Sequence, residues 1–348
     1  MDEITVPIYL MAGFLESGKT SFLNFTIEQD YFQIDGPTLL ILCEEGEEEF
    51  DEKALKKSRT SVEILENPED LTPERLVAYD AFYKAIEGNQ RTVLPISLEK
   101  QADGWYCDMQ QLERELARPE CKVMLLCSPQ NPTGKVWTLD ELQTMAELCQ
   151  RHGVRVISDE IHMDMVWSAH QHIPWSHVAR GDWALLTSGS KSFNIPALTG
   201  AYGIIESRQC REAYLTALKG RDGLSSPAVL ALTAHIAAYQ HGAPWLDALR
   251  QYLNANLDYV AEELNGTFPE LNWQTPHSTY LAWIDLRPLN INDALLQDRL
   301  IHQQKIAIMP GFTYGEEGRG FIRLNVGCPR AKLEKGVQGL IKAILSLR

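Results

Sequence analysis

The chain has 348 residues, with 32 Lys and Arg against 47 Asp and Glu, and therefore a net charge of −15. This length suffices for about two domains with a sizeable hydrophobic core. A chain so acidic repels nucleic-acid phosphates and anionic membranes, so we expect neither as a partner. Hydrophobic residues make up 45% and charged residues 23%, which excludes a disordered, collagen-like or coiled-coil chain.

The sequence has no pattern typical of a membrane span, a leader or a metal site. Its long apolar runs, such as those at 38–43 and 123–127, fall far short of the roughly 18 residues that a span needs. The N-terminus, MDEIT, is acidic where a secretory signal is basic. Seven cysteines form no CxxC pair, so we expect a cytoplasmic protein with reduced thiols, no disulfide framework and no metal ligands.

Charge is distributed unevenly along the chain. Residues 1–77 hold 18 acidic and 6 basic residues, net −12, and include the run EEGEEEFDE at 44–52, which is typical of a solvated loop. The remaining 271 residues hold 29 acidic and 26 basic residues, net −3, and all eight Trp and nine His. A Pro-containing polar stretch at 66–75 separates the two parts. We therefore expect a boundary near residue 77.

The first part contains a phosphate-loop motif. Residues 4–12 are apolar enough for a buried strand, residues 21–29 favour a helix, and GFLESGKT between them fits GxxxxGK[ST]. Backbone N–H groups of such a loop can hold a phosphate. A Gly-rich turn without a ligand is the alternative. The candidate nucleotide-phosphate residues are Gly13, Gly18, Lys19 and Thr20.

GFLESGKTSFLN and LLILCEEGEEEFD resemble the N-terminal part of the CobW family of P-loop GTPases, which are linked to metal-cofactor delivery. The resemblance covers only residues 4–76. The family's Walker-B strand, guanine-reading motif and cysteine-rich metal motif have no counterpart downstream. The resemblance therefore implies a fragment whose GTP and magnesium site is vestigial, with weak binding and negligible hydrolysis.

The second part repeats a strand–loop–helix pattern. Segments 123–128, 155–160 and 184–189 each favour a strand and end in polar residues. Between the first two, Thr138 and Glu141 form a capping-box pattern and Gly153 ends the expected helix. Helical crossovers imply parallel strands, whose carboxyl ends meet at one edge of the sheet. The intervals of 28 and 32 residues place three polar side chains at that edge: Asn131, Asp159 and Lys191.

This trio suits pyridoxal phosphate. A lysine can form the Schiff base, a carboxylate can keep the pyridine nitrogen protonated, and an amide can bond the ring hydroxyl. Each residue also has a plain alternative: Asp159 as a helix cap, Asn131 as a turn residue before Pro132, and Lys191 as a surface lysine. Their order and spacing favour a shared site.

SPQNPTGKVW, SDEIHMDMVW and TSGSKSFNIPALTG resemble the fold-type-I pyridoxal-phosphate enzymes, and most closely the MalY/PatB branch of C–S β-lyases. The resemblance runs from Tyr79 to Arg348. It implies that Lys191 forms the Schiff base, that Asp159 pairs with the pyridinium and that Asn131 bonds the ring hydroxyl.

The same resemblance implies further roles. Tyr79 stacks on the cofactor ring. Without the resemblance, we would expect this tyrosine to lie in the hydrophobic core. Ser188 and Ser190 lie on the phosphate side, and His162 occupies a place where related aminotransferases often carry a tyrosine. Arg323, in GFIRLN, grips the substrate carboxylate, whereas an arginine in a strand is otherwise more often an ion-paired surface residue.

We therefore expect α/β architecture in three parts: a CobW-like fragment at 1–77, a large domain with a mainly parallel sheet at 78–244, and an α+β small domain at 245–348. The family's N-terminal part, with its phosphate loop, has no counterpart here, so the large domain is expected to be truncated and the enzyme to be poor. The expected reaction is β-elimination on a sulfur amino acid such as cystathionine, in a homodimer.

Three alternatives stay open at this point. Within the same fold, an aminotransferase would transfer the amino group to a keto acid and release no pyruvate from cystathionine. From other classes, a GTP-binding metallochaperone rests only on residues 4–76. A regulatory binding protein is the third, because the family resemblance also implies contact with a transcription activator.

Overall fold

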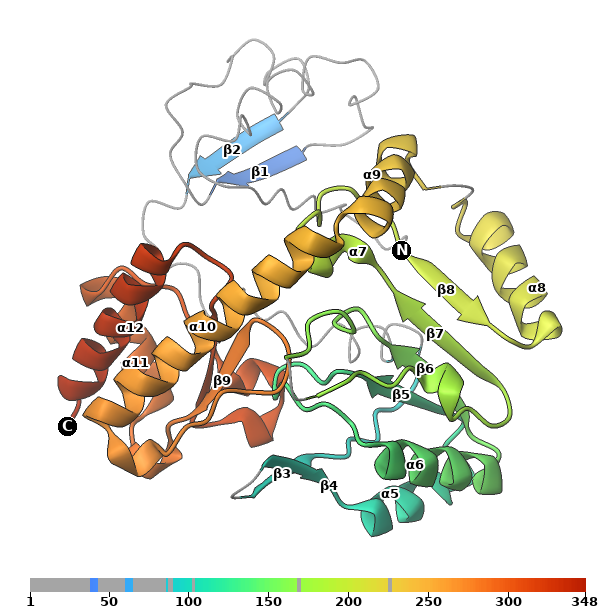
Figure 1. The fold of residues 1–348 in the computed structure, drawn as a ribbon, viewed down its shortest axis with the longest axis horizontal. Helices are drawn as coiled ribbons and strands as arrows, with labels where there is room; N and C mark the ends of the chain where they lie inside the picture. The colour runs from blue at the N-terminus through green and yellow to red at the C-terminus, as the bar shows by residue number, and fades with distance from the viewer. Residues whose placement is uncertain are drawn as a thin grey trace, which may run out of the picture. The chain divides into compact units, whose positions relative to one another are not determined.

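The computed structural model describes the chain at residues 38–42, 60–64, 86, 90–101, 104–167, 170–224 and 227–348 (Figure 1). The chain divides into two compact units, Met1–Ala78 and Tyr79–Arg348. In the first unit, β1 (Thr38–Leu42) pairs in parallel with β2 (Thr60–Ile64). The expected strand at 4–12 and the four phosphate-loop candidates lie outside the described residues: Gly13, Gly18, Lys19 and Thr20.

The second unit contains a four-stranded sheet in the order β5–β6–β7–β8. Its strands are β5 (Val123–Cys127), β6 (Arg155–Asp159), β7 (Trp183–Thr187) and β8 (Tyr202–Ile205). The first three run parallel, and β8 runs antiparallel to β7. The three strands expected from the sequence are thus confirmed to within one or two residues, and so is their common direction.

Helix α6 (Leu139–His152) crosses between β5 and β6, as the sequence predicts. The Thr138 hydroxyl accepts from the Glu141 backbone N–H, and the Glu141 carboxylate accepts from the Thr138 backbone N–H. Gly153 ends the helix in the left-handed region, at φ +67°. The capping box and the glycine stabilise the two ends of α6, because they supply hydrogen-bond partners to backbone groups that have none within the helix.

A first hydrophobic core lies between the sheet and two helices, α6 and α5 (Met109–Leu116). Leu126, Val156 and Leu185 supply it from the three parallel strands. In Figure 1, α5 and α6 lie side by side next to β5 and β6. This packing buries one face of the sheet and leaves its carboxyl edge available for a site.

The C-terminal part packs helices against a second, antiparallel sheet, in the order β10–β11–β9. The strands are β9 (Leu281–Asp285), β10 (Met309–Pro310) and β11 (Phe321–Asn325). Helices α10 (Ala243–Thr267) and α12 (Arg330–Leu345) share the second core with them. Figure 1 shows α10 as the long helix that runs beside this group.

Shorter elements complete the described chain. The remaining strands and α-helices are β3 (Leu98–Gln101), β4 (Gly104–Cys107), α7 (Gly189–Ser192), α8 (Arg208–Thr216), α9 (Val229–His241) and α11 (Asp293–Asp298). Short 3₁₀ turns are η3 (Trp175–His177), η5 (Pro269–Leu271), η6 (Arg287–Leu289), η8 (Gly311–Tyr314) and η9 (Glu316–Gly318). Two π-helical turns are η4 (Ala217–Arg221) and η7 (Arg299–Gln303).

The expected boundary after Pro244 falls in the first turn of α10, so the division of the second unit into a large and a small domain stays a prediction. Among the helices in the described ranges, none is both long and apolar enough to cross a bilayer. Within those same ranges, no three His, Cys, Asp or Glu side chains are grouped to hold a metal ion.

Candidate active site

Three polar residues follow neighbouring strands at one edge of the parallel sheet. The strand register places Cys127 opposite Asp159 and Asp159 opposite Leu186. Asn131 comes four residues after Cys127, and Lys191 comes four residues after the end of β7. The structure therefore brings Asn131, Asp159 and Lys191 to the same edge, as the spacing predicted.

Asp159 is held at the end of β6 by backbone groups. Its Oδ1 accepts from the Ile161 N–H at 3.0 Å, and its carbonyl oxygen accepts from the Ser128 N–H at 2.9 Å. Turns rather than a helix follow at 161–164. The helix-cap alternative for Asp159 is therefore wrong, and its carboxylate lies at a strand end where ligands bind in open α/β sheets.

Arg323 on β11 reaches the same edge from the C-terminal sheet. Its Nη1 donates to Asn131 Oδ1 at 3.3 Å, and its guanidinium lies 4.9 Å from the centre of the Tyr314 ring. In the part of the chain that the structure describes, no carboxylate lies within ion-pair distance of Arg323. The expected alternative, an ion-paired surface arginine, does not hold among these residues, and the guanidinium can take an anionic ligand.

His162 is buried between these groups, with 3% of its surface exposed. Its Nδ1 is buried without a hydrogen-bond partner among the described residues. Burial, together with the smaller effect of the positive charges of Lys191 and Arg323, lowers the pKa of His162 to about 4. The imidazole is therefore neutral at physiological pH and sits close to both cations.

Lys191 lies in α7, a helix of only four residues whose N-cap is Ser188. The Ser188 hydroxyl donates to the Gly200 carbonyl oxygen at 2.6 Å and accepts from the Ser190 N–H at 3.1 Å. A serine has one hydroxyl hydrogen, and that hydrogen is engaged with Gly200. Because a phosphate oxygen needs a donor, this geometry does not support the expected phosphate contact of Ser188. It leaves that role to the partly exposed Ser190.

Sequence reasoning missed a buried carboxylate next to Asp159. Glu160 is fully buried and accepts from Ser158 Oγ at 2.9 Å, from the Trp175 N–H at 2.7 Å and from His172 Nε2 at 2.8 Å. Alternation along an extended chain turns Glu160 away from the face that Asp159 occupies. Glu160 thus fixes the segment leading to η3, a structural role for which the DE dipeptide gave no signal.

Two aromatic residues bear on the site. Tyr79, expected on the cofactor ring, lies outside the described residues. Tyr280, just before β9, was missed: its ring centre lies 5.8 Å from that of His162, edge to face. Burial raises the pKa of Tyr280, whereas the charge of Arg323 acts in the opposite direction. Only the fold reveals this contact, because nothing in the sequence around Tyr280 signals a site.

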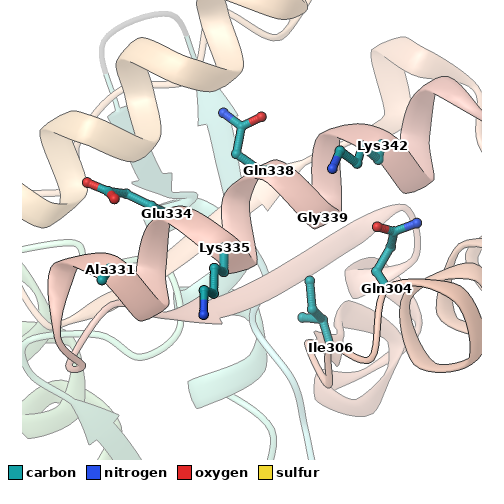
Figure 2. Close-up of a pocket in the computed structure, with 8 residues that line it drawn as sticks. All are labelled: Gln304, Ile306, Ala331, Glu334, Lys335, Gln338, Gly339 and Lys342. Atoms are coloured by element: carbon teal, nitrogen blue, oxygen red, sulfur yellow. The ribbon is translucent and has the colours of Figure 1, made fainter.

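Two hollows lie outside this cluster. The first, of about 390 Å³, lies between α12 and the segment at 304–306, and Figure 2 shows the polar side chains that line it, among them Lys335 and Gln338. The second, of about 400 Å³, lies between β8 and α9 and is mainly apolar. Neither is lined by the residues expected to carry chemistry, so neither is the candidate active site.

The comparisons with known proteins agree with this geometry. A sequence profile for "Aminotransferase class I and II" matches residues 62–340. Protein MalY of Escherichia coli (strain K12) is 79% identical over 271 residues, which cover 78% of this chain and 70% of MalY. Cystathionine beta-lyase PatB of Bacillus subtilis (strain 168) is 36% identical over 290 residues, covering 82% of this chain and 74% of PatB.

Among solved structures, cystalysin from Treponema denticola, which contains a pyridoxal 5'-phosphate cofactor, shares the fold with a TM-score of 0.73 at 24% identity. The alignment covers 94% of this chain and 76% of cystalysin. The chain belongs to the aminotransferase class I and II family and has its fold-type-I α/β architecture. Its relatives place it in the pyridoxal-phosphate-dependent C–S β-lyase branch of that family.

Proposed function

We propose that the chain cleaves the Cβ–S bond of a sulfur amino acid of the cystathionine type and yields a thiol, pyruvate and ammonia. The observation that carries this proposal is the cluster of Lys191, Arg323 and neutral His162 at the edge where Asp159 ends β6. It combines an amine that can act as a base, a cation for an α-carboxylate and a carboxylate for a pyridinium.

The residues at this edge fit pyridoxal phosphate. Asn131 accepts from Arg323 through Oδ1, which orients its amide nitrogen as a donor for a ligand oxygen. The buried Nδ1 of His162 has no partner within the described chain, as expected for a site whose ligand supplies one. Asp159 would hold the pyridine nitrogen, Ser190 would donate to the phosphate, and Tyr79 would stack on the ring.

When bound, pyridoxal phosphate supplies an aldehyde that bonds amines and a ring that withdraws electrons from Cα. Lys191 then takes the Cα proton as general base. The Asp159 carboxylate would keep a proton on the pyridine nitrogen, because a neighbouring negative charge favours the protonated form. Arg323 binds the substrate carboxylate and thereby fixes which Cα bond faces Lys191.

The neutral His162 leaves the positive charges in this cluster to Lys191 and Arg323. A protonated imidazole here would repel both cations, and desolvation opposes its charge first. A neutral imidazole instead offers Nδ1 for a hydrogen bond with a cofactor or substrate oxygen. The sequence predicted that His162 lies in the site, and this hydrogen bond is the role we propose for it there.

The test is pyruvate release from cystathionine by the full chain with saturating pyridoxal phosphate, in the absence of any keto acid. We expect pyruvate, thiol and ammonia in equal amounts, and no release by Lys191→Ala. Transfer of the amino group to an added keto acid, without pyruvate from cystathionine, would identify an aminotransferase instead.

We also propose that a second copy of this chain covers the apolar surface of α9. Val229 and Leu230 are 77% and 72% exposed, and Ile236 is 55% exposed, next to the hollow between β8 and α9. An exposed apolar patch of this kind marks an interaction surface. Light scattering should give a dimer mass that Leu230→Glu reduces to the monomer; a monomeric wild-type chain would contradict this.

For residues 1–77 we propose a vestigial nucleotide-phosphate site, on the GxxxxGK[ST] pattern alone. Calorimetry with Mg-GTP should give weak or no binding, and Lys19→Ala should leave pyruvate release unchanged. Tight guanine-selective binding would instead favour a functional GTPase part.

A further inference from the structure

Asp164 contacts the helix that carries Lys191. It lies five residues after Asp159, in the loop that follows β6. Its Oδ2 accepts from the Ser192 hydroxyl at 2.7 Å, and Ser192 is fully buried. Because Ser192 is the last residue of α7 and directly follows Lys191, this bond acts one residue from the expected catalytic amine.

Helix α7 needs such support. Four residues form a single turn, which is not stable by itself. At its start, Ser188 is tied to Gly200 and faces His235 Nε2 at 3.3 Å. At its end, Ser192 is tied to Asp164. Lys191 is thus presented by a turn that side-chain hydrogen bonds hold at both ends.

Asp164 is itself fixed from a third direction. Its carbonyl oxygen accepts from Arg250 Nε, on α10, at 2.5 Å, and Arg250 Nη1 donates to Asp247 at 2.8 Å. The next residue, Met165, bonds through its carbonyl oxygen to the Thr279 N–H at 2.8 Å. Hydrogen bonds from α10 and from the segment before β9 therefore fix the backbone that carries the Asp164 carboxylate.

We propose that Asp164 is a positioning residue for Lys191: through Ser192 it holds the turn that directs the Lys191 amine toward the Asp159 edge. This inference rests on the function proposed for Lys191. We expect the hydrogen bond to Ser192, and not the negative charge of Asp164, to hold the turn. An uncharged oxygen in the same place could accept the same bond. Misplacing a catalytic group by a fraction of an ångström is enough to slow a reaction.

The experiment compares Asp164→Ala, Asp164→Asn, Ser192→Ala and the double variant Asp164→Ala/Ser192→Ala in the full chain. Loss of the bond should lower kcat for pyruvate release roughly ten- to hundredfold, with KM changed less than about threefold. Asp164→Asn should retain most activity, because its amide oxygen still accepts from Ser192. The double variant should lose no more activity than the less active single variant, since Asp164→Ala and Ser192→Ala remove the same hydrogen bond.

Asp258→Ala is the matched control. It removes a hydroxyl–carboxylate bond of the same length, 2.7 Å from Thr275, and a 3.0 Å bond from the Asn254 amide, at an exposed position in the C-terminal part of the chain. We expect it to leave kcat unchanged, and thermal unfolding of each variant reports whether the fold is kept.

A second readout does not depend on the lyase reaction. Apo-protein is mixed with pyridoxal phosphate, samples are reduced with borohydride, and the rate of cofactor attachment to Lys191 is followed by mass spectrometry. Asp164→Ala and Ser192→Ala should attach roughly tenfold more slowly than Asp164→Asn and Asp258→Ala. Equal rates in all four variants would overturn the proposal. Slower attachment in a chain that releases no pyruvate would support Asp164 and refute only the proposed reaction.

Discussion

Arg323 Nη1 donates a hydrogen bond to Asn131 Oδ1 over 3.3 Å, between residues 192 positions apart in the chain. The bond joins the antiparallel C-terminal sheet to the carboxyl edge of the parallel sheet. It orients the Asn131 amide and holds the guanidinium at the edge where Asp159 and Lys191 lie. A substrate bound at this edge would therefore meet groups from both sheets at once.

This arrangement predicts that Arg323→Lys loses most of the activity. An ammonium cannot form the two parallel hydrogen bonds that a guanidinium gives to a carboxylate, nor can it keep the Asn131 contact in the same geometry. We expect kcat/KM for pyruvate release to fall roughly 100-fold, mainly through KM.

Steady-state kinetics at saturating pyridoxal phosphate checks this. The matched control is Arg330→Lys, which changes a guanidinium that, like that of Arg323, belongs to a partly buried residue and lies over a tyrosine ring, 4.8 Å from the Tyr259 ring centre. A similar loss in both variants would mean that Arg323 acts through stability rather than through the substrate.

Lys191 should carry the cofactor. Borohydride reduction followed by peptide mapping is expected to find pyridoxal phosphate on Lys191 alone. Lys135 is the instructive comparison: its ammonium bonds the Trp105 carbonyl oxygen at 2.7 Å and Glu141 at 2.8 Å, so it is committed to the structure. A label on Lys135 would show that the site has been misplaced.

The sequence predicted those features that local signals encode. Strands β5, β6 and β7 are short apolar runs that end in polar residues, and α6 carries its own cap at each end. The spacing of Asn131, Asp159 and Lys191 then follows from repeated βα units. These signals are read without knowing any long-range contact, which is why they were reliable.

Features that depend on distant contacts could not be predicted. The commitment of Ser188 to Gly200 depends on how the chain returns after α7, and the bond from Ser192 to Asp164 spans 28 residues. Glu160 was unremarkable in the sequence, yet it is the buried acceptor for three groups. Packing of distant parts of the chain determines which side chains meet, and local sequence patterns carry little information about that packing.

His162 should make stability depend on pH. Its folded-state pKa, about 4, lies below the ordinary value of 6.5, because burial disfavours the charged form. Between these values the unfolded chain binds a proton that the folded chain does not, so the free energy of unfolding rises with pH across this window. The stabilisation from the neutral His162 is complete above pH 6.5 and is lost as the pH falls to about 4. The full loss is on the order of 3 kcal/mol.

Urea unfolding at pH 5 and pH 7 measures this contribution. Replacing the imidazole in His162→Gln should reduce the difference in unfolding free energy between the two pH values, whereas His177→Gln, at an exposed position, should not. An unchanged difference in His162→Gln would show that the pKa of His162 is not lowered in the folded protein.

Two glycines with the same backbone conformation should respond differently to alanine. Gly134 has φ +71° and Gly153 has φ +67°, a region that costs an L-residue about 1 kcal/mol. A Cβ at Gly153 would meet no atom within 4 Å, whereas a Cβ at Gly134 would lie 2.5 Å from Pro276 Cβ and 2.8 Å from the Ser278 carbonyl oxygen. The alanine must therefore push apart the contact between the loop after β5 and the segment before β9.

We expect Gly153→Ala to lower the free energy of unfolding by about 1 kcal/mol and to leave catalysis intact. Gly134→Ala should cost roughly 3 kcal/mol, because the strain of a displaced backbone is added to the same conformational penalty. It should also weaken pyridoxal-phosphate binding, since the displaced loop carries Asn131 and accepts a 2.9 Å hydrogen bond from Ser278 at Gly134. Urea unfolding and cofactor titration of both variants test this, and equal losses would show that the Gly134 contact yields without moving the site.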